Sequence, residues 1–346
     1  MGGLLTRDAF RDAVFARDGG RCVVCGRPAQ DAHHIMERRL FPDGGYYLDN
    51  GASLCGEHHV LAETTELSVE EIREACGIAD AVLPEHLCDG DRYDKWGNPV
   101  LPSGGRGKGE LFGDPSVRRA LGAAGALGLF RDRVKYPRTY HLPSSPGAGR
   151  GDRTLPSNEA LEGRQVVATV KMDGENTSVY RDHAHARSLD SGRHESRWPV
   201  WDLQARIGHE IPEGWRVCGE NLYARHTIHY RALPAWFLGF SVWDDGNVCL
   251  GWDDTLEWLA LLGVEPVPAV YEGVWDEAAV LASLPDECCG GPCEGLVVRV
   301  RDAFHYSRFR SSVAKWVAAE FRRELEADPG HFRPWYLRSV VPNRLA

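Results

Sequence analysis

Apolar and β-branched runs in the second half of the chain predict strands. They are short, are bounded by Gly, Pro or Asp, and cover residues 165–171, 177–181, 215–219, 235–243 and 294–300. Apolar positions at helical spacing predict helices over 254–262 and 314–326 that cover these strands. We therefore expect an α+β domain over residues 131–346.

The first half has a different pattern. Residues 6–17 predict a helix that ends at Gly19 and Gly20, and Ser68 with Glu71 forms a capping box for a helix that runs to Gly77. Residues 89–130 are rich in Gly and Pro and lose periodicity apart from a short helix at 116–129. We expect a small domain over residues 1–88 and a linker over 89–130.

Composition places the chain among globular proteins. With 346 residues, 43% apolar and 26% charged, it is long enough for two or three domains with proper cores. No apolar stretch approaches the ~20 residues of a membrane helix, so we expect no membrane partner. Ten cysteines are too few for a disulfide scaffold, and the first residues do not resemble a secretion signal, which favours a reducing cytoplasm.

Charge is distributed unevenly around a formal net value of −10. Residues 1–88 carry eight arginines against fifteen acidic residues, whereas residues 299–346 carry nine arginines and Lys315 against five acidic residues. Aromatic residues are interleaved with the basic ones in this last stretch. The pattern fits a surface that binds phosphates and stacks bases, and it equally fits a solvated helix with core aromatics.

Lys171 is one of only five lysines among forty basic residues, and it directly follows the apolar run 166–170. A deprotonated amine is a nucleophile, whereas a guanidinium stays charged at any usable pH. A lysine retained in such an arginine-rich chain therefore points to covalent chemistry. Its pKa, ordinarily ~10.4, must be lowered by a few units for attack at neutral pH.

Five short motifs surround this lysine in sequence order. They are Lys171-Met-Asp-Gly, Glu220 in Cys-Gly-Glu-Asn, Phe240 in Phe-Leu-Gly-Phe, Glu294 in Cys-Glu-Gly-Leu-Val-Val-Arg, and Lys315 in Val-Ala-Lys-Trp. Together they resemble motifs I, III, IIIa, IV and V of the covalent nucleotidyltransferases, the superfamily of RNA ligases, DNA ligases and mRNA capping enzymes. The resemblance covers residues 131 to about 330.

The resemblance implies an adenylation domain of antiparallel sheets with flanking helices. It implies that Lys171 forms lysyl-AMP from ATP, that Phe240 stacks on the purine, and that Glu220 and Glu294 hold Mg or Mn and the ribose. Lys315 becomes the neighbouring cation, and Arg187 contacts the attached nucleotide and the 3′-OH strand. Arg299 replaces the usual lysine at the end of motif IV, and Val313 replaces the first lysine of motif V.

The RNA-ligase branch fits best. Only 31 residues follow Lys315, fewer than the OB-fold that DNA ligases and capping enzymes usually append, and residues 135–139 resemble the entry strand of that branch. We expect sealing of 5′-phosphate and 3′-OH ends in RNA repair, on RNA or an RNA-containing duplex. Two alternatives stay open: a non-catalytic nucleotide sensor with a zinc interaction module, and a capping-like guanylyltransferase that prefers GTP.

Two pairs of metal-ligand residues lie in the first domain. They are Cys22 with Cys25 and Cys55 with His58, about thirty residues apart, and these side chains are the ones that tetrahedral zinc prefers. The spacing predicts a structural zinc.

His33, His34, Asn50 and His59 lie between and after these pairs, and their order resembles HNH endonucleases with a ββα-metal core. The resemblance implies that His33 and His59 hold a catalytic divalent ion, that His34 activates water, and that Asn50 orients His34. Such nucleases usually leave the ends that a ligase joins. Retention of this fold for nucleic-acid recognition without hydrolysis is the alternative.

Overall fold

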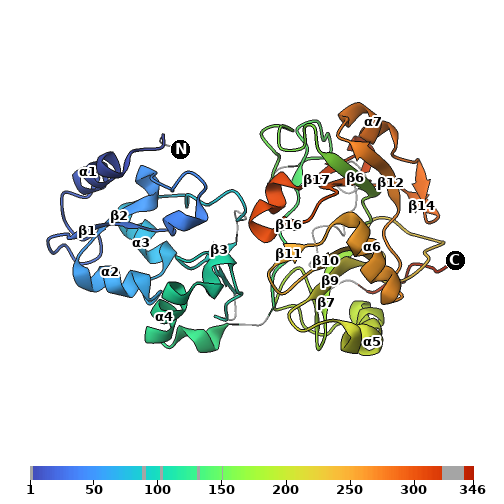
Figure 1. The fold of residues 1–346 in the computed structure, drawn as a ribbon, viewed down its shortest axis with the longest axis horizontal. Helices are drawn as coiled ribbons and strands as arrows, with labels where there is room; N and C mark the ends of the chain where they lie inside the picture. The colour runs from blue at the N-terminus through green and yellow to red at the C-terminus, as the bar shows by residue number, and fades with distance from the viewer. Residues whose placement is uncertain (1–2, 88–90, 102–103, 131–132, 150, 322–338) are drawn as a thin grey trace. The chain divides into compact units, whose positions relative to one another are not determined.

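The computed structural model describes residues 3–87, 91–101, 104–130, 133–149, 151–321 and 339–346. The chain divides into two units, Met1–Lys135 and Tyr136–Ala346, each with its own apolar core (Figure 1). Among the described helices, none combines the length and the apolar character needed to cross a lipid bilayer.

Unit 1 begins with a helix, two paired strands and a second helix. These are α1 (Arg7–Arg17), β1 (Asp31–His34), β2 (Gly51–Leu54) and α2 (Gly56–Glu63). The side-chain oxygen of Thr6 accepts the N–H of Ala9 and caps α1, whose range agrees with the helix that the sequence predicts. β1 pairs antiparallel with β2, and α2 follows directly. This order of strand, strand and helix is the one that a ββα arrangement requires.

The capping box predicts the next helix correctly. In α3 (Val69–Cys76), the side chain of Ser68 accepts the N–H of Glu71, and the Glu71 carboxylate accepts the N–H of Ser68. The helix ends at Gly77, which adopts a left-handed conformation with φ of 69°.

The stretch that we expected to be a linker contains secondary structure in its described part. Its elements are β3 (Arg92–Tyr93), β4 (Pro99–Val100), α4 (Pro115–Ala123) and short 3-10 turns at Glu110–Gly113 and Ala126–Leu129. Two further 3-10 turns, at Arg38–Leu40 and Leu48–Asn50, lie between β1 and β2. Trp96, Val117 and Leu121 form a small core. Asp94 is buried and accepts hydrogen bonds from Asn98 and Arg106. Side-chain contacts hold this segment together, which explains why it shows no periodicity.

Unit 2 contains two sheets. The six-stranded sheet has the order β16-β11-β10-β9-β7-β8 and the five-stranded sheet the order β12-β6-β15-β17-β5. The strands of the first sheet are β7 (Glu175–Tyr180), β8 (Ala184–Ala186), β9 (Arg216–Asn221), β10 (Phe237–Trp243), β11 (Val248–Cys249) and β16 (Phe304–His305). Those of the second are β5 (Tyr140–His141), β6 (Gln165–Val170), β12 (Ala269–Val274), β15 (Gly295–Val300) and β17 (Val313–Val317). A hairpin of β13 (Glu287–Cys288) and β14 (Gly291–Pro292) stands apart.

Within the two sheets, neighbouring strands are antiparallel except for β5 beside β17. The sheets share one core, in which Val166 and Val298 of one sheet pack with Cys218 and Trp243 of the other. The helices are α5 (Trp198–Ile207), α6 (Trp252–Leu261) and α7 (Glu277–Ala282). α5 and α6 pack on the six-stranded sheet. The antiparallel α+β architecture agrees with the sequence prediction.

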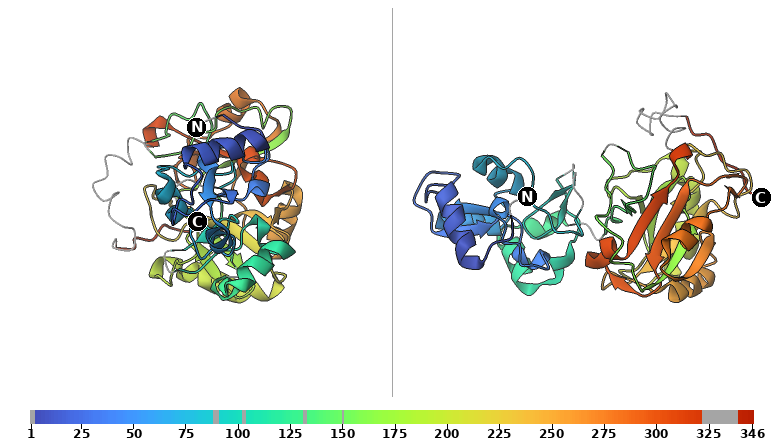
Figure 2. Two further views of the ribbon diagram at one scale, coloured as in Figure 1. Left: turned by 90° about the vertical axis from the view of Figure 1, so that its left-hand side faces the viewer. Right: turned by 90° about the horizontal axis from the view of Figure 1, so that it is seen from above.

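One predicted helix is wrong at its start. Residues 313–317 form β17, which pairs with β15, and the two strands lie side by side in Figure 2. The apolar residues of this stretch allow either period, and the strand is stabilised by its hydrogen bonds to β15 on one side and β5 on the other. The remainder of the predicted helix falls largely on residues 322–338, outside the described part of the chain. The same holds for much of the basic and aromatic stretch.

Candidate functional site

A cavity of about 370 Å³ opens in unit 2, within the ~300–1,000 Å³ range of small-molecule sites. It brings together six of the residues that the sequence singled out, although they lie up to 144 positions apart: Lys171, Arg187, Glu220, Phe240, Arg299 and Lys315. Both sheets contribute to its walls. Glu294, the seventh predicted residue, reaches the cavity through its contact with Lys171.

Lys171 follows β6, and its main-chain N–H donates to the carbonyl of Gly295. Its Nζ lies 2.6 Å from an oxygen of Glu294, and its side chain remains 24% exposed. Burial acts to lower the pKa of Lys171, but the nearby carboxylates of Glu294 and Glu220 outweigh it and raise the pKa. The direction is opposite to the lowered pKa that the covalent chemistry requires. Lys171 would therefore need a cation nearby, which lowers the pKa of its amine, to act as the predicted nucleophile.

Glu220 and Glu294 have the complementary perturbation. Burial raises the pKa of Glu220 to about 8 and that of Glu294 to about 7, although Lys171 opposes both shifts. Glu220 lies on β9 opposite Asn176, and Glu294 directly precedes β15. Buried carboxylates that face one another are destabilised as anions, and their oxygen atoms are the ligands that Mg²⁺ or Mn²⁺ prefers. The donor set therefore fits a divalent ion.

Lys315 and Arg299 lie on the neighbouring strands β17 and β15. Lys315 faces Val297 in the register, and burial together with the charge of Lys171 lowers the pKa of Lys315 to about 8. Arg299 is buried, and its Nη2 donates to the carbonyl of Leu250 at 2.6 Å. Its Nη1 is buried without a hydrogen-bond partner. The cavity thus has basic groups on the side of the five-stranded sheet.

Phe240 owes its position to an irregularity in β10. The register with β9 shifts between Gly239 and Ser241, so Phe240 bulges out of the ladder, and a β-bulge re-aims the side chain that it carries. The ring of Phe240 contacts that of Tyr136 edge to face, with centroids 5.4 Å apart. Both rings line the cavity. An aromatic wall of this kind can stack on a nucleobase.

Besides Nη1 of Arg299, three polar atoms of cavity-lining residues are buried without a hydrogen-bond partner among the described residues. They are Oδ1 of Asn176, Nε1 of Trp252 and Nε of Arg187, which follows β8. Buried polar atoms are ordinarily hydrogen-bonded, so these atoms mark places where a bound molecule can complete the network. Sequence reasoning identified Arg187 but missed Asn176 and Tyr136. Asn176, five residues after Lys171 at the start of β7, was open to inference from the hairpin that follows the lysine.

The predicted zinc ligands converge in unit 1. The ligand atoms of Cys22, Cys25, Cys55 and His58 lie within 4.8 Å of one another. Sγ of Cys25 is 3.8 Å from Sγ of Cys55, which fits two sulfurs of a tetrahedral zinc with Zn–S bonds of ~2.3 Å. Hydrogen bonds from His58 lower the pKa of Cys55 to about 6, and Arg27 lowers that of Cys25. The group has the ligand types, spacing and thiolate character of a structural zinc site.

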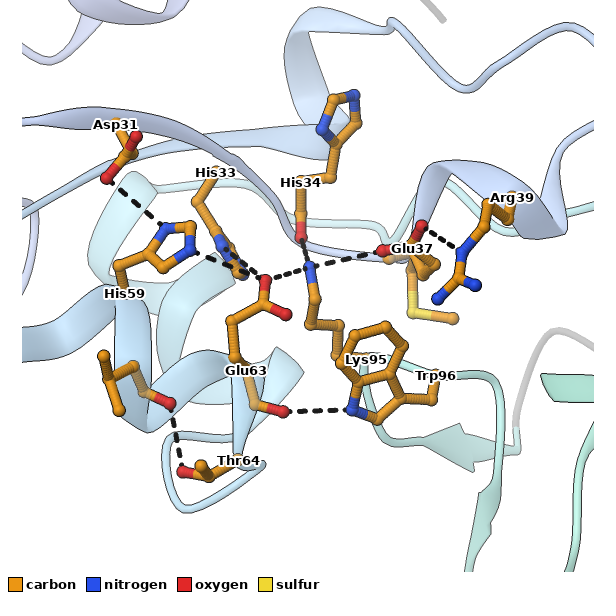
Figure 3. Close-up of polar contacts among 12 residues, drawn as sticks. Asp31, His33, His34, Glu37, Arg39, His59, Glu63, Thr64, Lys95 and Trp96 are labelled. Atoms are coloured by element: carbon orange, nitrogen blue, oxygen red, sulfur yellow. Dashed lines mark hydrogen bonds and ion pairs between the residues drawn. The ribbon is translucent and has the colours of Figure 1, made fainter. Parts of the chain in front are cut away.

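A second cluster joins His33 and His59 to Glu63, which the sequence analysis did not identify (Figure 3). Oε1 of Glu63 lies 3.6 Å from Nδ1 of His33 and 3.8 Å from Nε2 of His59. His59 and Glu63 lie four residues apart on α2 and therefore share one face of the helix. Burial lowers the pKa of His33 well below its usual value, so this imidazole is neutral and can act as a ligand. The spacing of Glu63 after His59 was the available signal.

Lys95 places an ammonium group beside this cluster. The side chain is buried, and its Nζ lies 3.0 Å from Oε1 of Glu63 and donates to the carbonyl of His34 at 2.9 Å (Figure 3). It comes from the segment that we expected to be a linker.

His34 and Asn50 are not brought to the second cluster in the predicted way. His33 and His34 are successive residues of β1, so their side chains point to opposite faces (Figure 3). The ring of His34 stacks on Phe10 with centroids 4.6 Å apart. The amide of Asn50 bonds to the main chain of Met36 and Gly45 rather than to His34. The structure therefore gives Asn50 a role in holding the loop.

The second unit is similar to a known protein family in part of its sequence. A family model described as RNA ligase matches residues 164–317, the stretch that contains Lys171, Glu220, Phe240, Glu294 and Lys315. No curated protein shows a significant match in sequence.

Solved RNA ligases resemble part of the chain. A Naegleria gruberi RNA ligase with PPi is 16% identical, with a TM-score of 0.41 over 57% of this chain and 59% of its own. A mutant of that ligase with ATP and Mn is 17% identical, with a TM-score of 0.36 over 56% and 62%. An archaeal ATP-dependent RNA ligase is 15% identical, with a TM-score of 0.39 over 56% and 51%. The chain thus spans about three fifths of the first ligase's length. At this degree of similarity, the description of unit 2 as an antiparallel α+β fold comes from its own strands and sheets and not from these ligases.

Proposed function

We propose that unit 2 is an ATP-dependent RNA ligase domain that seals 5′-phosphate and 3′-OH ends through a lysyl-AMP intermediate. The observation that carries the proposal is the position of Lys171. Its Nζ lies at the wall of a cavity of about 370 Å³ and contacts the buried Glu294, with Phe240 and Lys315 on the same walls. The RNA ligase family model that matches residues 164–317 supports it.

In the first step, the deprotonated amine of Lys171 attacks the α-phosphorus of ATP. A nitrogen–phosphorus bond forms, the bond to the bridging oxygen breaks, and pyrophosphate leaves. Glu294, 2.6 Å away, orients the amine, and the proton that the amine loses passes to solvent. Mg²⁺ or Mn²⁺ held by Glu220 and Glu294 would supply the positive charge that the amine and the phosphates need.

The other cavity residues have roles in binding. Phe240 stacks on the adenine, and Lys315 and Arg299 contact phosphate oxygens. Arg187 contacts the nucleotide and the incoming 3′-OH strand through the guanidinium whose Nε has no hydrogen-bond partner in the described part of the chain. AMP then passes from Lys171 to the 5′-phosphate of the strand, and a 3′-OH attacks that phosphate and releases AMP.

Incubation with α-labelled ATP or GTP and Mg²⁺ or Mn²⁺, followed by a denaturing gel, tests the proposal. We expect label from ATP to stay on the protein. Label from GTP alone would indicate a capping-like enzyme, and no label under any metal condition would indicate a nucleotide sensor.

Lys171→Arg should abolish the adduct, because the positive charge remains while the nucleophile is lost. Lys135→Arg, a lysine of unit 1 that pairs with Asp91, is the matched control and should label like the wild-type protein. Undiminished labelling of Lys171→Arg would remove Lys171 as the nucleophile.

We further propose that unit 1 is a zinc module that recognises or cuts nucleic acid through a divalent ion at His33, His59 and Glu63. The specific observation is that three ligand atoms of this second cluster lie within 4.8 Å of one another, separate from the zinc ligands. Together, the two units would form an RNA-repair protein. Its location in the cytoplasm is a prediction from the sequence.

Glu63→Gln tests the second cluster. We expect it to weaken binding of one Mn²⁺ by at least about tenfold, because an amide is a poorer ligand than a carboxylate, while zinc stays bound. Metal titration by calorimetry and metal analysis measure the two sites. Glu74→Gln removes an equal charge from the exposed face of α3 and should change neither. Equal Mn²⁺ binding by both variants would contradict the assignment.

A further inference from the structure

Three arginines that the ligase motifs do not include gather around one segment of unit 2. The main-chain N–H of Arg225 donates to the carbonyl of Val341 at 2.7 Å, and that of Arg344 donates to the carbonyl of Tyr230 at 3.0 Å. Residues 339–346 are thereby fixed along residues 224–233. This pairing brings Arg225, Arg231 and Arg344 together, and we refer to them as the arginine cluster.

The arginine cluster is exposed and has no acidic partner. All three side chains face solvent, and none forms an ion pair with any residue that the structure describes. His229 reports their proximity, since burial and the charges of all three arginines lower its pKa. Like charges held together without counter-charges favour binding of an anion.

The segment that carries this cluster is attached to the loop that follows Lys171. Oδ2 of Asp173 accepts the N–H groups of Thr227 and Ile228, each at 2.7 Å, and the hydroxyl of Tyr230 accepts the N–H of Asp173 at 2.9 Å. Asp173 is two residues from Lys171. The cluster therefore flanks the loop of the reactive lysine.

A small hollow of about 60 Å³ extends the surface beyond Arg225. Its walls include His226, Ser196, Ser339 and Val340. Glu175 also lines it, but its carboxylate accepts a hydrogen bond from Nε of Arg197 at 2.6 Å and is neutralised. A hollow of this size is too small for a nucleotide but can accept one phosphate group.

We propose that the arginine cluster binds phosphates of the nucleic-acid strand whose end reacts at Lys171. This inference rests on the proposed ligase function and names the path of its substrate. The chain carries a net charge of −10, which disfavours unselective binding of nucleic acid. A local group of arginines that form no ion pairs among the described residues can instead hold the phosphate backbone of the strand. The triphosphate of ATP is the other polyanion near Lys171, and the test separates the two.

The experiment uses the full chain and a fluorescein-labelled nicked RNA duplex. Affinity is measured by fluorescence anisotropy between about 50 and 200 mM salt, a range over which phosphate contacts are strongly screened. Arg225→Gln with Arg231→Gln is the test variant. Arg206→Gln with Arg181→Gln removes the same charge from exposed arginines of α5 and of the turn that follows β7. Adenylylation of Lys171 and sealing of the nick are followed in parallel.

We expect the test variant to bind the duplex about tenfold more weakly and to lose about one unit of salt slope for each arginine removed. Its adenylylation and its KM for ATP should match those of the control variant, while sealing falls with binding. Addition of Arg344→Gln should lower affinity again.

Equal binding of RNA by the test and control variants would overturn the inference while leaving the ligase proposal in place. A raised KM for ATP with unchanged RNA binding would overturn it as well and assign the cluster to the triphosphate. Absence of adenylylation in the wild-type protein, in contrast, would be a failure of the proposed function itself.

Discussion

At the scale of single residues, the candidate ligase site is a balance of buried charges. Lys171 and Lys315 face Glu294 and Glu220 in one cavity, and each perturbs the pKa of the others. The raised pKa of Lys171 shows that the carboxylates dominate. The identity of a residue predicts the chemistry that it can carry out, whereas its neighbours determine its protonation state in the free protein.

Glu220 predicts a pH dependence of stability. Its folded pKa is raised from 4.5 to about 8, so protonation stabilises the folded state fully below about pH 4.5, and this contribution is lost as the pH rises through 8. We expect the melting temperature of unit 2, in metal-free protein, to fall from about pH 5 to about pH 8. Glu220→Gln should flatten this fall, because an amide does not titrate. Calorimetry at a series of pH values measures the difference.

Glu162→Gln supplies the control, since Glu162 is an exposed acid of the same unit. It should show the same pH dependence as the wild-type protein. The neutral imidazoles of unit 1 act in the opposite direction, because burial lowers the pKa of His34 to about 4, so only the difference between variants isolates Glu220. Parallel curves for wild type and Glu220→Gln would show that Glu220 is ionised throughout this range.

The histidines show what sequence order alone leaves open at this scale. From the sequence alone, His33 and His34 are equally plausible ligands. In the structure, the alternation of side chains along a strand places them on opposite faces of β1. Glu63 escaped notice because a glutamate on a charged helix is common. Its importance follows from the helical turn that places it under His59 and from the fold that brings His33 alongside.

At the scale of elements, Gly295 fixes the approach of β15 to β17. A Cβ atom at this position would lie 2.0 Å from the carbonyl oxygen of Trp316, so any side chain forces the two strands apart. We expect Gly295→Ala to destabilise unit 2 by about 2–4 kcal/mol and to reduce adenylylation further than stability alone explains, because Glu294 and Lys315 would move. Chemical denaturation and the adenylylation assay measure the two effects.

Gly192→Ala is the matched change, since its added Cβ would meet nothing within 4 Å. It should leave stability and adenylylation close to wild-type values. A Gly295→Ala protein that labels and unfolds like the wild type would show that β15 and β17 can separate without cost.

Elements with strong local signals were predictable, and those held by distant contacts were not. The Thr6 cap and the Ser68 capping box give α1 and α3 almost to the residue. β17 was expected as a helix because its apolar residues allow either period, and its pairing with β15 and β5 decides the outcome. The segment around Asp94 folds through buried side-chain hydrogen bonds that no periodicity reports.

At the scale of the whole molecule, the chain consists of two units with different sources of stability. Unit 2 buries a large core between two sheets, formed by residues such as Trp243, Phe309 and Leu142. Unit 1 has a smaller core, which includes Cys22 and Cys55, two of the predicted zinc ligands. Motif order in the sequence predicted most of the residues that meet in the Lys171 cavity and in the two clusters of unit 1. The arginine cluster was not predicted, because its members lie up to 119 positions apart. They meet only through the pairing of residues 339–346 with residues 224–233.

This division predicts that removal of zinc separates the fates of the two units. A structural zinc contributes an apparent ~10–16 kcal/mol, comparable with the whole stability of a small domain, so unit 1 should unfold when a zinc-selective chelator is added. Unit 2 lacks a Cys and His cluster of this kind among its described residues and should keep its fold. Calorimetry should therefore lose one of two transitions, while adenylylation in excess Mg²⁺ stays within about twofold, because domains with separate cores fold separately.

Two cysteine variants locate the effect within unit 1. Cys25→Ser removes a ligand atom of the zinc cluster, and Cys76→Ser removes a thiol of α3 that is not among the four ligands. Cys25→Ser should reproduce the effect of the chelator without any chelator present, whereas Cys76→Ser should keep both transitions and remain sensitive to it. Loss of adenylylation together with zinc would show instead that unit 2 depends on unit 1 for its fold, because chelation leaves every residue of the Lys171 cavity unchanged. Two transitions that survive complete removal of zinc would mean that the apolar core of unit 1 is sufficient by itself.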